Sequence, residues 1–156
     1  MSLKKNQLEI INLLKEHEKV IEDLYRVYAK KFPKHREFWT TLARQENEHA
    51  KWIMKLTEKI EEGETYFNEE RFTVEAIKSS ISYIKKEKEK VGDETLLIEA
   101  LSTAHNLESG LLEKEYFETV AGDSVELKHL LRRLASATAV HEKKVKGLLE
   151  KERKRN

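Results

Sequence analysis

The stretch WTTLARQENEHAKWIMKLTEKI, Trp39 to Ile60, decides the fold. Residues at alternating spacings of three and four form one stripe along it: Trp39, Leu42, Glu46, His49, Ile53, Leu56 and Ile60. This spacing is typical of a helix seam that packs against other helices. Glu46 and His49 lie one turn apart on the same face, at positions that the pattern predicts to be buried.

The rest of the chain favours further long helices, because only five glycines and one proline interrupt it and no alternating strand pattern competes. We expect long helices over about residues 5–32, 36–62, 94–120 and 124–152, and a shorter helix over about 73–90. Two long-helix hairpins joined by about thirty residues predict an all-α fold in a single domain, 1–156. The expected architecture is a four-helix bundle of two antiparallel hairpins with a long crossover that contains a short extra helix.

The composition excludes several classes of function. The chain has no cysteine, which removes disulfides, thiol catalysis and thiolate-held metal centres but leaves sites built from Glu and His. Charged residues make up 38% of the chain, yet the formal net charge is only +1, which argues against nucleic acid as the main partner. No stretch approaches the ~20 apolar residues of a membrane span and no signal-peptide pattern is present, so a soluble cytoplasmic protein is expected.

The second half of the chain contains a partial copy of the central motif. TLARQENEHA (Thr41–Ala50) and RLASATAVHE (Arg133–Glu142) share Leu-Ala, and each has a histidine at the same later position. Thr138 stands where Glu46 stands in the first copy, and His141 corresponds to His49. Such similarity indicates two hairpins related by a pseudo-twofold axis, with equivalent positions meeting at the centre.

Acidic residues also interrupt the apolar stripes of the other two long helices. Glu18, with Glu22 one turn later as a competitor, lies in the first stripe, and Glu108 lies in the third. The predicted core therefore holds at least three carboxylates and two imidazoles. Burying clustered carboxylates costs several kcal/mol each unless positive charge compensates. Because Lys and Arg fall mainly on outer faces, a metal cation is the simplest neutraliser, and these donors suit iron or manganese, with zinc as a further option.

Aromatic residues at helical spacing are ordinarily core. Tyr25 and Tyr28 are therefore predicted to pack inside the bundle, with the alternative that a phenol hydrogen-bonds a ligand carboxylate or takes part in electron transfer near iron. Trp39 and Trp52 are interpreted as packing or interface residues.

This arrangement resembles the ferritin-like di-iron carboxylate proteins, and among them the rubrerythrin-like branch, over about residues 8–150. In that superfamily a Glu from each of two helices joins a Glu-x-x-His from each of the other two. EKVIEDLYRVYA (Glu18–Ala29) is similar to the family's first-helix pattern, which favours Glu18 over Glu22 as the ligand. ENEHA is similar to the second-helix motif, and the resemblance implies Glu46 as bridging ligand and His49 as terminal ligand.

The second half matches the same family less completely. NLESGLLEKEYF is similar to a Glu followed by Tyr eight residues later, which implies Glu108 as a ligand and Tyr116 as that aromatic. In the fourth helix only His141 of the Glu-x-x-His remains, because Thr138 replaces the second bridging acid. The extra third-helix acid of rubrerythrins falls at Leu111.

Three groups are candidates to replace the lost acid. His105 lies one turn before Glu108 and could reach the same face, and Thr138 itself could hold a hydroxide or water. Glu115 lies two turns after Glu108 in the same stripe, which is expected to be too far along the axis. The alternatives left open are a working two-metal site and an impaired site that binds one metal or none.

The resemblance implies a non-haem di-iron protein that reacts with peroxide or dioxygen in oxidative-stress or iron handling, and so a possible oxidoreductase. The alternative is a metal-binding or structural helical bundle without redox turnover. Because these 156 residues contain no cysteine, we expect a separate protein, rather than a cysteine-bearing domain like that of full rubrerythrins, to donate electrons. A homodimer is expected, with apolar residues of the crossover helix as its possible interface.

Overall fold

The computed structural model describes residues 3–61, 74–110 and 125–155, and this part of the chain is all-helical. In chain order the elements are α1 (Leu3–Lys31), η1 (Pro33–His35), α2 (Arg36–Glu61), α3 (Val74–Lys90), α4 (Leu97–Ser109) and α6 (Val125–Arg155). The all-α prediction is confirmed for these residues. The predicted helix over 94–120 starts instead at Leu97, and its later positions Leu111, Glu115 and Tyr116 lie outside the described residues.

The later start of α4 has a local cause. The amide of Gly92 donates to Thr95 Oγ1 at 2.9 Å, and the amide of Thr95 donates to the Gly92 carbonyl at 3.1 Å. This turn occupies residues that the pattern had assigned to the helix. Leu96 is extended (φ −92°, ψ 150°), and its amide donates to the Glu99 carboxylate, so α4 begins immediately after it.

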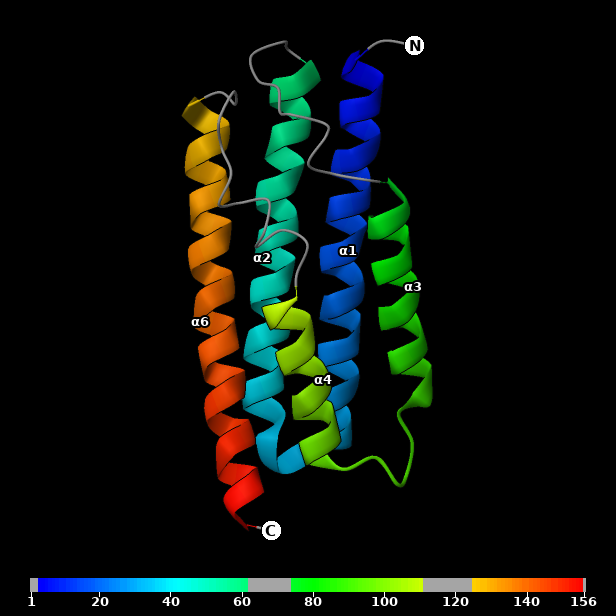
Figure 1. The fold of residues 1–156 in the computed structure, drawn as a ribbon, viewed down its shortest axis with the longest axis vertical. Coiled ribbons are helices and arrows are strands. Elements are labelled where there is room, and N and C mark those ends of the chain that lie inside the picture. Colours follow the sequence, from blue (N-terminus) through cyan, green and yellow to red (C-terminus); the bar gives the residue numbers. More distant parts are fainter. Residues whose placement is uncertain (1–2, 62–73, 111–124, 156) are drawn as a thin grey trace.

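Helices α1 and α2 form an antiparallel hairpin (Figure 1). The hairpin turns at Pro33, which pushes the preceding Phe32 out of the helical region (φ −118°, ψ 77°) and opens η1. Within the seam of α2, Trp39, Leu42 and Ile53 are buried. The side chains of Leu56 and Ile60 lie outside the described part.

Helix α3 is the short helix predicted within the crossover. It runs along α1, so that α4 starts at the end of the bundle where α2 starts (Figure 1). Ile77, Ile81 and Ile84 are buried, each worth roughly 1.5–3 kcal/mol of hydrophobic stabilisation. His17 and Ser80 add a hydrogen bond of 2.7 Å between α1 and α3.

Helix α4 packs against α6, which runs antiparallel to it (Figure 1). Trp39 lies in the aromatic part of the core, with its ring centroid 5.6 Å from Tyr25 and 4.8 Å from Tyr28. All three are buried, as the helical spacing predicted. No helix in the described ranges has a stretch long and apolar enough to cross a membrane.

Candidate metal centre

A layer of polar side chains lies inside the bundle, and each of its members has an exposed fraction of 3% or less. Four helices contribute to it: α1, α2, α4 and α6. The structure places in this layer all five residues that the sequence had singled out as main ligands: Glu18, Glu46, His49, Glu108 and His141.

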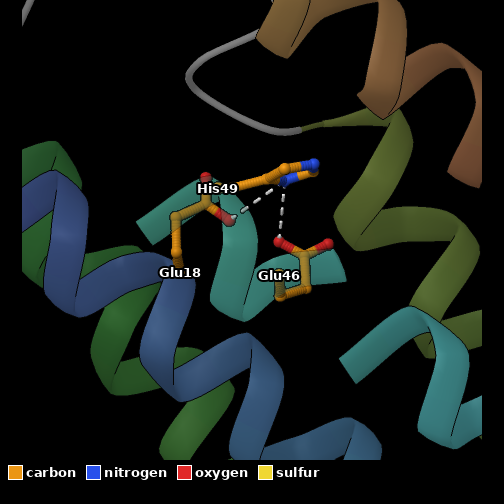
Figure 2. Close-up of side chains that lie close together, drawn as sticks. All are labelled: Glu18, Glu46 and His49. Atoms are coloured by element: carbon orange, nitrogen blue, oxygen red, sulfur yellow. Dashed lines mark ion pairs between the residues drawn. The ribbon is translucent and has the colours of Figure 1, made fainter. Parts of the chain in front are cut away.

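Glu18, Glu46 and His49 form a first group. Each offers a ligand atom, and these atoms all lie within 4.8 Å of one another. His49 Nδ1 is 3.4 Å from Glu46 Oε2 and 3.9 Å from Glu18 Oε2 (Figure 2). One cation between the three side chains would contact two carboxylates and one imidazole.

Glu46, Glu108 and His141 form a second group with the same 4.8 Å limit. His141 Nδ1 is 3.1 Å from Glu46 Oε1 and 3.5 Å from Glu108 Oε1. Glu46 therefore belongs to both groups and faces them with different oxygens, Oε1 toward His141 and Oε2 toward His49. That is the geometry a carboxylate needs to bridge two cations.

The surrounding carboxylates raise the pKa of both histidines and so favour their protonated forms. Burial lowers the pKa of His49, but hydrogen bonds to Glu18 and Glu46 outweigh it and raise the pKa to about 11. Burial likewise lowers the pKa of His141, and Glu108 and Glu46 raise it to about 9. The two imidazolium protons offset part of the charge of three buried acids, and a metal bound there would take over this role and displace them.

Glu108 gives a direct test of whether a cation fits. Its Oε1 accepts a hydrogen bond of 2.7 Å from the Tyr25 hydroxyl. Its Oε2 is fully buried and accepts no hydrogen bond within the described residues. Leaving a buried acceptor unsatisfied costs about 1–3 kcal/mol, so a cation at this oxygen would remove a real penalty. The residues present fit a metal.

Tyr25 is buried, and its phenol also hydrogen-bonds a candidate ligand carboxylate, which was the alternative to core packing alone. Burial raises its pKa well above the usual value, and the charges of Glu108 and Glu46 raise it further. The hydroxyl therefore keeps its proton and donates a hydrogen bond to Glu108, which orients that carboxylate.

The less certain candidates of the sequence are not brought into either group. Glu22 is buried, but its carboxylate pairs with Lys19 at 2.6 Å and with Arg26 at 2.8 Å. Burial would raise the pKa of Glu22, whereas hydrogen bonds to these two cations lower it below its usual 4.5. His105 hydrogen-bonds Ser109 at 3.4 Å on the same helix.

Thr138 is 3% exposed, one turn before His141 on α6. The two groups consist of Glu and His side chains only. Within the described part of the chain, no carboxylate stands in for the bridging acid that Thr138 replaces.

A pocket of about 460 Å³ between α2 and α6 reaches both imidazoles, and sequence reasoning did not anticipate it. Trp52 lines it, with its ring centroid 5.2 Å from that of His49. The guanidinium carbon of Arg133 lies 4.4 Å from the centroid of the Trp52 ring. Trp52 follows His49 by three residues, so helical spacing could have predicted that these two side chains are neighbours. Arg133 comes from α6 and has no comparable local signal.

Gln45 was also missed. Its Oε1 accepts a hydrogen bond of 2.7 Å from His141 Nε2. Gln45 precedes Glu46 directly and lies beside the seam rather than in it, so periodicity gave no reason to single it out.

Comparisons of the chain with protein-family models, with curated proteins and with solved structures found no match.

Proposed function

We propose that this protein is a metal-binding helical bundle of the ferritin-like, rubrerythrin-like kind, whose buried centre holds two metal ions bridged by Glu46. One observation carries the proposal: the two oxygens of Glu46 face two different histidines, each with one further carboxylate. A purely structural ion-pair core would not require one acid to serve two such groups.

The donor set favours iron or manganese over softer metals. Each ion would meet two carboxylates and one imidazole, and no thiolate exists in the chain. The three carboxylates would offset three of the four positive charges of two divalent ions.

The proposed reaction is the reduction of peroxide or dioxygen. Iron held by the Glu and His side chains of the two groups would supply two electrons, one from each ferrous ion. These reduce one hydrogen peroxide and two protons to two water molecules, or one dioxygen and two protons to one hydrogen peroxide. The chain's own residues hold the ligands in place: Tyr25 orients Glu108, and the bundle buries the carboxylates away from bulk water. Electrons to restore the ferrous state would come from a separate donor protein.

The test is anaerobic loading with Fe²⁺, followed by removal of free metal and elemental analysis. We expect about two iron ions per chain, oxidation on addition of peroxide, and a rise in melting temperature with bound metal. Glu46→Ala should lose both ions, because both groups use Glu46. Glu48→Ala removes an exposed acid two residues away and should bind iron normally. A wild-type protein that holds no metal, or a Glu46→Ala variant with wild-type uptake, would refute the proposal.

Thr138 favours a second candidate, a metal-binding module without redox turnover. Its buried hydroxyl stands at the position of the second bridging acid and carries no charge. This candidate predicts one ion per chain and no peroxide consumption in the same experiment.

A further inference from the structure

We propose that Gln45 is the positioning residue of His141: it holds the ring so that Nδ1 faces the metal of the second group. This inference rests on the proposed metal centre. It starts from the two nitrogens of the ring, of which Nε2 donates to Gln45 Oε1 at 2.7 Å. The other, Nδ1, lies 3.1 Å from Glu46 Oε1 and 3.5 Å from Glu108 Oε1.

An imidazole binds a metal only through an unprotonated nitrogen, so the proton must stay on the other one. A carbonyl oxygen can accept a hydrogen bond from N–H but cannot donate one, and therefore selects the ring form with hydrogen on Nε2. Gln45 offers its amide oxygen at this place. The contact leaves Nδ1 available between the two carboxylates and fixes the plane of the ring.

The two histidines differ in their need for such a partner. His49 lies on the same helix as Glu46, three residues later, so α2 itself sets their separation. His141 comes from α6 and must be oriented across a helix interface that carries the 460 Å³ pocket. The ring of His49 instead lies against Trp52, with 5.2 Å between the ring centroids and 34° between the ring planes.

The experiment uses two variants as backgrounds, each of which leaves only one of the two groups intact. Glu108→Ala keeps the first group intact, and Glu18→Ala keeps the second. Gln45→Leu is added to each, and the metal-free proteins are titrated with Co²⁺ alone, followed by its visible absorption. In the Glu18→Ala background we expect Gln45→Leu to weaken Co²⁺ binding 10- to 100-fold, the usual effect of losing an outer-shell partner. In the Glu108→Ala background the affinity should change less than about twofold.

A conservative variant and a matched control complete the design. Gln45→Glu keeps an acceptor oxygen and should retain or exceed wild-type affinity, because a carboxylate partner makes the imidazole a stronger donor to metal. Thr41→Val alters the same pocket wall but touches neither histidine in the described contacts, and should bind Co²⁺ like wild type. If Gln45→Leu fails to fold, Gln45→Glu still decides: weaker binding to the second group would contradict the role of Gln45.

Equal losses in both backgrounds would mean a merely structural role and overturn the inference, as would no loss in either. These outcomes leave the proposed metal centre intact. A wild-type protein that binds no Co²⁺ at all refutes the metal centre and Gln45's role together.

Discussion

The α1–α2 half and the α4–α6 half of the bundle differ at one position of the candidate metal centre: Glu46 in the first half corresponds to Thr138 in the second. The first half supplies a complete group, with Glu18 on one helix and both Glu46 and His49 on the other. The second half supplies Glu108 and His141, and Thr138 stands where its own acid is missing. In the structure the second group is nevertheless complete, because Glu46 reaches it from α2. A motif that looks incomplete in one copy can be completed by the other when both meet at the centre.

Among changes confined to one half, the largest effect should come from removing the terminal acid of that half. Glu18→Ala and Glu108→Ala each destroy one group and spare the other, so each variant should keep one of the two metal ions. Elemental analysis after gel filtration measures the loss. If either variant released both ions, or neither, the two groups would not be separate binding sites.

Placing an acid at position 138, where the second half lacks one, should have a smaller effect on metal binding, confined to the second group. We expect Thr138→Glu to tighten binding of the second metal ion roughly tenfold, equivalent to about 1.4 kcal/mol, because the site gains a charged donor. The metal-free variant should melt at a lower temperature than wild type, since it buries a fourth carboxylate. Metal titration and thermal unfolding, each with and without metal, check both outcomes.

Thr138→Val is the matched control, with nearly the same shape and no charge. It should not tighten binding of either ion. Unchanged metal affinity in Thr138→Glu would show that the position does not face the centre.

The smallest effect is expected at Glu22, the acid one turn from Glu18. Its lowered folded-state pKa means that its ion pairs stabilise the protein above pH 4.5, the unfolded-state value, and that this contribution is lost as the pH falls through the lower folded-state value. Lys19 and Arg26 are about half exposed, so the contribution is about 0–1 kcal/mol. Glu22→Gln should therefore melt slightly lower than wild type at pH 7, with the difference vanishing in acid.

Iron uptake provides the control for this prediction. Glu22→Gln should bind metal like wild type. Reduced uptake would mean that Glu22, rather than Glu18, is a ligand of the first group.

The contrast between Glu18 and Glu22 shows how far periodicity reaches. Spacing predicted that the first helix buries an acid, and both acids are in fact buried. The choice between them depends on neighbours: Lys19 and Arg26 engage Glu22, while Glu18 meets His49 from another helix. Helical spacing identifies the face of a helix that is buried, but not which atoms meet across helices.

The contact of Gln45 with His141 and the first residue of α4 could not be predicted from the sequence, for related reasons. The Gln45 partner lies on α6, 96 residues away along the chain, and no local pattern encodes such a contact. The turn at Gly92 and Thr95 depends on one side-chain hydrogen bond that competes with helical pairing. The helices, the seam and the five buried candidates follow from periodicity, because burial of one apolar stripe governs all of them.

The sharing of Glu46 also orders events during synthesis. The first group uses α1 and α2, which are adjacent in the chain, whereas the second joins Glu46 to a histidine 95 residues later. Domains emerge from the ribosome N-terminus first, and contacts between distant residues form late. All three residues of the first group therefore leave the ribosome before α6, and if the proposed centre binds metal, its first group is the one that can assemble earlier.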